Sequence, residues 1–318
     1  MRRVIRILRW AAPAVIVLGM GFVGFGLWSA SDQLLSPSFV GAEKDLSVCK
    51  PVTESHWGPH CGNLRETSEF AFDEVQIPLH NNVNLPGWLI TTRGNGKGTG
   101  KGAIVLVHAG GADRREMSRY IRFYLNDGFD VLTFDLECHG EAPCPVYGLS
   151  YGERECSDLV AAYSLLKKSH DKVFVMGTSV GAVAALIAIP NLPGVAGIIA
   201  ENPYFNFDRL IREAKEAQRA PGFFLNGMIA LAKWRGSFSG QQSPATVLSG
   251  SSARPPILFI HSKADQTVSF HQTEDLAAIY QGPKSVWNPE RGSHAEIWDA
   301  DKKAYQDHIA QFLGLDGE

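Results

Sequence analysis

Short apolar segments alternate with amphipathic ones along most of the chain, which is typical of alternating strands and helices. The expected strands cover residues 103–107, 129–136, 172–176, 195–200, 256–260 and 284–287. The expected helices cover residues 113–125, 157–168 and 299–312, and a further helix follows the strand at 172–176. Segments 75–79 and 83–91, separated by His80-Asn81-Asn82, predict a hairpin ahead of the first of these strands. The pattern therefore predicts an α/β fold with a mostly parallel, twisted sheet covered by helices on both faces.

The segment around Ser179 has the features of a nucleophile turn. An apolar strand runs into Gly177-Thr178-Ser179-Val180-Gly181, and small residues follow at once. In a G-x-S-x-G turn the glycines let strand and helix approach closely, and the serine hydroxyl projects beyond the sheet edge. Ser179 is therefore the candidate nucleophile.

A serine hydroxyl needs a histidine to take its proton and a carboxylate to orient that histidine. His294 lies in a loop after the strand at 284–287, and Asp265 closes the strand at 256–260, which gives the order Ser, Asp, His. Glu201, at another strand end, is the alternative acid.

The same chemistry needs N–H donors for the oxyanion. The backbone N–H of Val180 follows the nucleophile directly, and a second donor is expected from the loop after the strand at 103–107. We expect Gly110 to supply it, with Ala109 as the alternative.

The N-terminus predicts a membrane anchor over residues 1–30. Four arginines precede an uncharged stretch at 10–30 that is bounded by Trp10 and Trp28. The expected topology is a single pass with the N-terminus in the cytoplasm and the catalytic domain on the exported side. A cleaved signal peptide is the alternative, and it would export the same domain.

Residues 31–69 are expected to form a connector, because they are too few for a core of their own and prolines interrupt them. Cys49 and Cys61 flank an irregular segment in which a disulfide would be useful, whereas the other cysteines could equally be buried thiols. With five cysteines at least one thiol stays free, and their spacings match no zinc site.

Residues 70–318 then form the main domain, with a helical cap insertion at about 204–254. Within it, residues 222–234 are mostly apolar, and arginines and lysines lie nearby. This composition suits a lipid surface beside an apolar acyl pocket. The alternative is a structural cap whose charges face water.

Composition excludes some classes of function. A chain of 318 residues with 45% hydrophobic and 20% charged residues is ordinary for a globular protein, and its net charge of −3 gives no reason to expect nucleic acid. The Gly/Lys loop at 92–102 lacks the spacing of a phosphate-binding loop. We expect no metal and no organic cofactor.

Residues 70–315 resemble the α/β-hydrolase superfamily, and within it the membrane-anchored abhydrolase-domain group typified by the bud-emergence-related protein. The resemblance rests on motifs at 107–111, 135–140, 177–181, 199–203, 257–265 and 292–294. It implies a Ser179, Asp265 and His294 triad in a serine hydrolase of esterase, lipase or thioesterase type. The expected partners are a small-molecule acyl substrate, with lipid-derived substrates included, and the membrane. A serine peptidase and a catalytically silent binding module are the alternatives.

Overall fold

The fold is seen in a computed structural model that describes residues 2–36, 45–79, 83–96 and 100–315, with the side chains of the first helix described from Leu18 onward. Within these residues eight strands form one sheet in the order β1-β2-β4-β3-β5-β6-β7-β8. The strands are β1 Asp73–Pro78, β2 Asn84–Ile90, β3 Gly102–Val107, β4 Phe129–Phe134, β5 Val173–Thr178, β6 Gly197–Glu201, β7 Ile257–Ile260 and β8 Lys284–Trp287. The expected hairpin is β1 with β2, whose connecting residues 80–82 lie outside the described residues.

The sheet is mostly parallel, as the alternation predicts. β2 pairs antiparallel with β1 and β4, whereas the pairs β4-β3, β3-β5, β5-β6, β6-β7 and β7-β8 are parallel. Parallel strands need crossover connections, so their carboxyl ends, and the loops that follow them, gather at one edge. The segments after β3, β5, β7 and β8 contain the predicted site residues.

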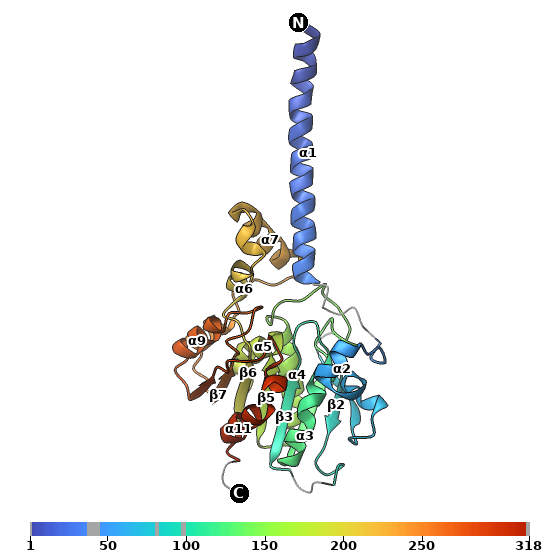
Figure 1. Ribbon diagram of the computed structural model, residues 1–318, viewed down its shortest axis with the longest axis vertical. Coiled ribbons are helices and arrows are strands. Elements are labelled where there is room, and N and C mark those ends of the chain that lie inside the picture. The colour runs from blue at the N-terminus through green and yellow to red at the C-terminus, as the bar shows by residue number, and fades with distance from the viewer. Residues whose placement is uncertain (1, 37–44, 80–82, 97–99, 316–318) are drawn as a thin grey trace.

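Helices cover both faces of the sheet (Figure 1). Because successive strand residues point to opposite faces, Val105 packs with one hydrophobic cluster and Ile104 with the other. The first cluster includes side chains of α4 Glu155–Lys167, α5 Val180–Ala188, α8 Pro244–Gly250 and α9 Phe270–Ile279. The second includes side chains of α3 Ser118–Asn126, α10 Ile297–Ala300 and α11 Lys302–Leu313, and a 3-10 turn, η4 Arg114–Met117, precedes α3.

Helix α1 (Arg2–Leu35) projects away from this body, with the C-terminus at the opposite end of the molecule (Figure 1). In the part of the chain that the structure describes, no helix combines the length and apolar character needed to cross a membrane. Trp10 and the four arginines of the predicted anchor lie outside the described side chains. The segment is helical as expected, but it continues past Ala30 to Leu35, so the predicted connector begins inside the helix.

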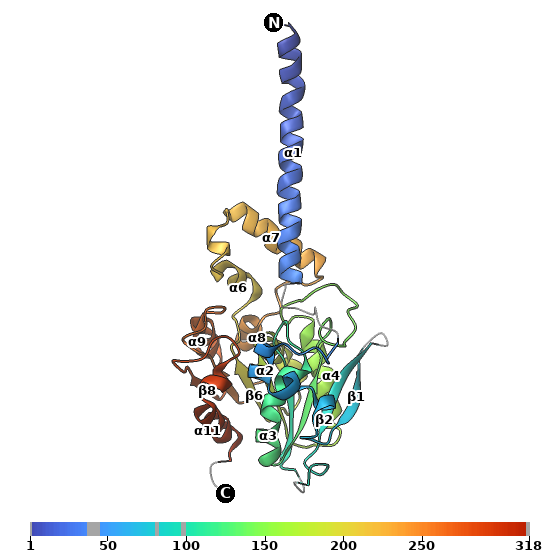
Figure 2. The same ribbon diagram turned by 45° about the vertical axis from the view of Figure 1, so that its right-hand side comes forward.

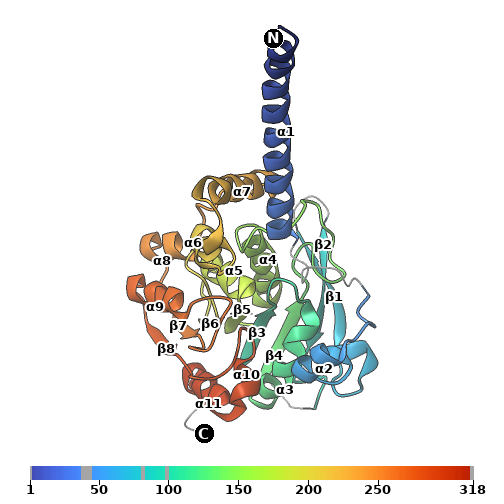
Figure 3. The ribbon, with the colours of Figure 1, turned by 45° about the horizontal axis from the view of Figure 1, so that its top comes forward.

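The cap consists of α6 Phe207–Glu213, η6 Ala217–Arg219 and α7 Gly222–Arg235. Its buried side chains share a third cluster with Leu35, the last residue of α1, which is completely buried. Figures 2 and 3 show α7 beside the end of α1 that meets the body. The N-terminal helix is therefore packed onto the cap, whereas α8 returns to the face of the sheet.

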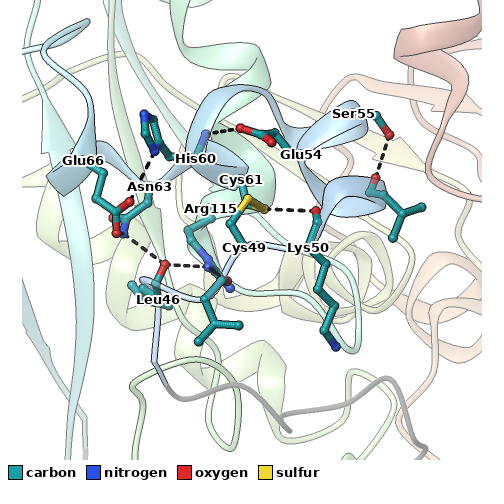
Figure 4. Close-up of a disulfide and its surroundings, with 12 residues drawn as sticks. Leu46, Cys49, Lys50, Glu54, Ser55, His60, Cys61, Asn63, Glu66 and Arg115 are labelled. Carbon is teal, nitrogen blue, oxygen red and sulfur yellow. Dashed lines mark hydrogen bonds and ion pairs between the residues drawn. A yellow bond between two sulfur atoms is a disulfide. The ribbon is translucent and has the colours of Figure 1, made fainter.

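The segment before β1 contains short helices, α2 Pro51–Trp57, η1 Pro59–Gly62 and η2 Leu64–Glu66. Prolines were expected to interrupt helices here, but Pro51 and Pro59 each start one, where the missing N–H costs nothing. A disulfide joins Cys49 to Cys61, and Arg115 Nη1 donates hydrogen bonds to the carbonyls of Leu46 (2.7 Å) and Val48 (2.9 Å) (Figure 4). The described part of the segment thus packs on the main domain, and its buried Leu46 and Leu64 belong to the second cluster.

Of the other three cysteines, two are oxidised and one is a free thiol. Cys138 and Cys144 form a second disulfide, although both could equally have been buried thiols on sequence grounds. Cys156 is a free, partly buried thiol, and burial raises its pKa to about 12. The odd cysteine count is accounted for by this residue.

Candidate functional site

Ser179 lies in a sharp turn between β5 and α5. Its backbone has φ +53° and ψ −114°, a conformation that side chains rarely adopt. A Cβ at Gly177 would lie 2.3 Å from the Gly181 carbonyl, and one at Gly181 would lie 2.4 Å from the Val107 carbonyl oxygen. Both flanking positions therefore require glycine, which explains the spacing seen in the sequence.

Ser179, His294 and Asp265 form a hydrogen-bonded row. His294 Nε2 lies 2.9 Å from Ser179 Oγ, and His294 Nδ1 lies 2.7 Å from Asp265 Oδ2. The structure thus brings together three side chains that are far apart in the sequence, each from a loop or turn at the carboxyl edge of the sheet. The geometry suits proton transfer from the serine hydroxyl to the imidazole.

Asp265 is held firmly by its neighbours. Its Oδ1 accepts hydrogen bonds from the backbone N–H groups of Thr267 (2.8 Å) and Val268 (3.0 Å). Its Oδ2 is shared by His294 and by a second histidine, His261, at 3.0 Å. Burial alone would raise the pKa of Asp265, but these hydrogen bonds and the charge on His294 hold it well below its ordinary value. Asp265 is therefore an ionised partner for His294.

The predicted oxyanion donors lie next to each other. A Cβ at Gly110 would come within 2.8 Å of Val180 Cγ2, and both residues line the same cavity as Ser179. Val180 is the first residue of α5, where a backbone N–H has no partner within the helix. Ala109, the alternative donor, already gives its N–H to Glu116 Oε2 at 2.8 Å. This bond favours Gly110 over Ala109.

A cavity of about 400 Å³ opens beside Ser179 and His294. Its walls are mostly apolar or aromatic and include Leu149, Tyr151, Val180, Tyr204, Leu210 and Val268. Tyr204 and Leu210 belong to the insertion, but the lining in the described residues takes nothing from α7. The prediction that residues 222–234 flank the acyl pocket is therefore wrong, because α7 packs on α1 and α6 instead.

The alternative acid, Glu201, points elsewhere. Its carboxylate accepts hydrogen bonds from Tyr120 (3.2 Å) and Tyr305 (2.5 Å) and is completely buried. Only its backbone carbonyl reaches the site, where it accepts the N–H of Ser179 at 2.8 Å. The geometry therefore favours Asp265 as the partner of His294.

Two residues of the site were given no role on sequence grounds. His261 directly follows β7, at the end of the apolar run before Asp265, so its position after a strand end was an available signal. Glu116 orders the loop after β3 from within η4, and nothing in its sequence neighbourhood indicates this. Among the described residues, no three His, Cys, Asp or Glu side chains are grouped so as to hold a metal ion.

Comparison with known proteins agrees with this fold. A model of the alpha/beta hydrolase family matches residues 104–313. The protein YqkD of Bacillus subtilis is 29% identical over 218 residues, which cover 66% of this chain and 70% of that protein. Among solved structures, the Pyrococcus furiosus esterase Pf2001 aligns with a TM-score of 0.62 and 19% identity over 78% of this chain and 91% of its own.

A second solved structure is similar over the same domain. The acylaminoacyl peptidase of Pyrococcus horikoshii aligns with a TM-score of 0.58 and 15% identity, covering 79% of this chain and 42% of that one. At these identities the solved structures show a shared fold. The family match spans most of the chain and includes the turn at Ser179, the end of β7 and the His294 loop. The chain therefore belongs to the alpha/beta hydrolase family.

Proposed function

We propose that the protein is a serine hydrolase that cleaves an ester or a related acyl bond through an acyl-enzyme on Ser179. The observation that carries the proposal is the row Ser179, His294, Asp265, with distances of 2.9 and 2.7 Å between successive polar atoms. The alpha/beta hydrolase family match supports hydrolysis in general. The choice of serine as nucleophile and of an ester as substrate rests on this row and on the apolar cavity beside it.

The residues would act in a fixed order. Ser179 Oγ attacks the substrate carbonyl carbon while His294 Nε2 takes the hydroxyl proton, and Asp265 stabilises the imidazolium that results. The N–H groups of Gly110 and Val180 hold the negative oxygen of the tetrahedral intermediate. His294 then gives its proton to the leaving group. In the second half of the reaction a water molecule attacks the acyl carbon while His294 takes its proton, and His294 returns that proton to Ser179 Oγ as the acid product leaves.

The cavity favours an acyl group with an apolar chain. Its walls present Leu149, Val180, Leu210 and Val268 next to the nucleophile. Each methylene buried there contributes about 0.8 kcal/mol of binding. We therefore place an acyl chain, including one derived from a lipid, in this cavity.

We further propose that the protein works at a membrane, in the group that the bud-emergence resemblance indicates, with the N-terminus cytoplasmic and the catalytic domain exported. The described part of α1 exposes large apolar side chains, namely Leu18, Met20, Phe22, Val23, Phe25 and Trp28. At 100° per residue these positions are spread around the whole helix, which suits a lipid environment better than one protein partner. The disulfides Cys49–Cys61 and Cys138–Cys144 suit an oxidising, exported location.

Hydrolysis of p-nitrophenyl esters tests the proposed activity. The full chain should hydrolyse esters of several acyl lengths, with kcat/KM rising with chain length until the cavity is full, and Ser179→Ala should be inactive. Cleavage of N-acyl peptides with no ester turnover would indicate a peptidase instead. No turnover of either substrate class by correctly folded protein would favour the silent binding module.

A further inference from the structure

The end of α1 contacts the wall of the cavity beside the candidate nucleophile. The last carbonyls of a helix have no partner within the helix, so they accept hydrogen bonds from other groups. Leu34 O accepts one from the Tyr151 hydroxyl at 2.7 Å, and Leu35 O accepts one from the Leu149 N–H at 2.8 Å. Leu149 and Tyr151 both line the cavity beside Ser179. Two residues of the cavity wall are thus bonded to the helix that projects from the body.

The loop that contains these two residues is held from two directions in alternation. Glu155 of α4 accepts hydrogen bonds from the backbone N–H groups of Ser150 (2.9 Å) and Gly152 (2.8 Å). The alternate residues, Leu149 and Tyr151, donate to α1 instead. The body of the protein therefore holds the course of the loop, whereas the pair that lines the cavity has its acceptors on α1.

The end of α1 also fits closely against the body. Leu35 is completely buried and packs in the third cluster with Phe207 and Phe238. A Cβ at Gly148, which has φ +83°, would lie 2.7 Å from Leu35 Cβ. The centre of the Tyr151 ring lies 4.6 Å from that of Phe207. Because a close-packed interior transmits displacements, a shift of this helix end would move the Tyr151 side chain through both its hydrogen bond and its aromatic neighbours.

We infer that the end of α1 determines acyl-chain specificity, with Leu34 and Leu35 as positioning residues that fix the cavity wall through Tyr151 and Leu149. The inference rests on the proposed function, with the acyl chain bound in this cavity. The hydrogen bonds described for the candidate triad include none to α1. A displaced helix end should therefore impair binding of a long acyl chain, which contacts the whole wall. An acetyl group occupies only the part next to the nucleophile and should be affected less.

The test compares Tyr151→Phe with the matched variant Tyr147→Phe in the full chain. Each removes one hydroxyl that donates to α1, because Tyr147 donates to Asp32 Oδ1 at 3.0 Å, and Asp32 keeps its pairing with Arg235. Among the described residues, Tyr151 lines the cavity and Tyr147 does not.

The measurement is kcat/KM for p-nitrophenyl octanoate divided by kcat/KM for p-nitrophenyl acetate. Tyr151→Phe should lower this ratio about fivefold, the effect of losing one hydrogen bond, mainly by raising KM for the octanoate. Tyr147→Phe should leave the ratio unchanged. An unchanged ratio in Tyr151→Phe, or an equal fall in both variants, would contradict the inference.

A second measurement depends neither on turnover nor on a substitution at Tyr151. The Ser36 N–H donates to Asp32 O at 2.8 Å in the last turn of α1, and Ser36 is not among the described residues that line the cavity. Its hydrogen exchange in Ser179→Ala protein therefore reports the order of the helix end. Coupling between two sites is reciprocal, so octanoate should slow this exchange severalfold and acetate should not. Failure of octanoate to bind, or unchanged exchange once it is bound, also counts against the inference.

The two measurements together separate this inference from the proposed function. Absence of ester turnover by folded wild-type protein, with octanoate still slowing exchange at Ser36 in Ser179→Ala, would overturn the proposed function but not the coupling of α1 to the cavity. Turnover of both esters, with the ratio unchanged in Tyr151→Phe and the exchange unaffected by octanoate, would overturn the inference alone.

Discussion

Ser179 adopts a positive φ that few serines adopt, and this conformation directs its hydroxyl toward His294. Replacing Ser179 or His294 by alanine removes the nucleophile or its base while leaving the surrounding packing in place. We expect kcat to fall by roughly four to six orders of magnitude with an unchanged fold, measured by ester turnover and circular dichroism. Near-wild-type turnover by Ser179→Ala would contradict the assignment of the nucleophile.

Asp265 and Glu201 can be distinguished by matched amide substitutions. Asp265→Asn should lower kcat by about 10⁴. An amide has a single acceptor oxygen, so it cannot accept from the backbone N–H groups of Thr267 and Val268 and from His294 at once, and an NH2 group facing His294 favours the wrong tautomer. Glu201→Gln should retain turnover, since the hydrogen bonds described for its carboxylate come from Tyr120 and Tyr305 and not from His294. Loss of turnover in Glu201→Gln with retention in Asp265→Asn would move the acid to Glu201.

At the residue scale, the sequence was most informative where backbone geometry restricts the choice of amino acid. Gly177 and Gly181 are required by close backbone contacts, and the positions of Asp265 and His294 follow from strand ends. His261 and Glu116 could not be assigned in this way. Each acts through contacts that form only in the folded chain. A single histidine or glutamate belongs to no sequence motif whose spacing would identify the residue that it contacts.

At the element scale, the Cys49–Cys61 disulfide closes the segment that packs against η4 and α3 (Figure 4). Replacing both cysteines by serine should lower the free energy of unfolding by about 3 kcal/mol, the value for closing a loop of this length. Thermal unfolding without reductant would measure it. Cys156→Ser is the matched control, because that thiol is free, and it should cost less than about 1 kcal/mol. Equal stabilities of the double variant and the wild type would show that the segment is held without the disulfide.

The junction between α1 and α7 depends on Arg235. Its guanidinium pairs with Asp32 at 2.7 Å, donates to the Trp28 carbonyl and the Ser31 hydroxyl, and lies 3.8 Å from the centre of the Trp28 ring. Arg235→Ala should therefore release α1 and make the chain near Leu35 roughly tenfold more susceptible to protease, as loss of charged hydrogen bonds predicts. Arg212→Ala serves as the control, because this arginine is exposed on α6 and donates to Asn226 of α7 instead of to α1. Equal cleavage rates would mean that apolar packing alone holds α1.

Elements were predicted well where periodicity and burial agree. The observed bounds of the parallel strands, for example, differ only slightly from the expected ones. The segment 222–234 was interpreted less well, because composition shows that a helix is apolar but not what it faces. In the structure Phe224 lies against Gly26, and Leu27 lies against Gly227, so part of this apolar surface joins two helices. A sequence without known partners could not indicate that contact.

At the scale of the whole molecule, α1 and α7 lie at the same end of the protein (Figure 2). Both helices expose apolar side chains. Phe223 and Trp234 are 71% and 73% exposed and are about three helical turns apart, so they share one face of α7. That face is opposite the buried Leu225, Ile229 and Ala232. It is therefore available to a lipid surface.

Serine at both Phe223 and Trp234 should weaken binding of the full chain to anionic vesicles and leave turnover of a soluble acetyl ester unchanged. Vesicle flotation at low salt measures the binding. Serine at Val52 and Val286, which are also exposed but lie on α2 and β8, gives a control. Unchanged flotation of the α7 variant would show that this face does not contact lipid.

The proposed topology makes a separate prediction. In intact cells or vesicles, protease added on the exported side should reach the catalytic domain, and the protein should stay in the membrane fraction after a carbonate wash. A soluble exported protein that begins near Ser31 would show that the first residues are a cleaved signal.

The central claim is that Ser179 is a nucleophile activated by His294. A fluorophosphonate reagent reacts covalently with such a serine, and peptide mass spectrometry locates the added group. The account predicts stoichiometric phosphonylation of Ser179, none in Ser179→Ala, and strongly slowed labelling in His294→Ala. Folded wild-type protein that stays unlabelled, or that is labelled at another serine, would contradict it.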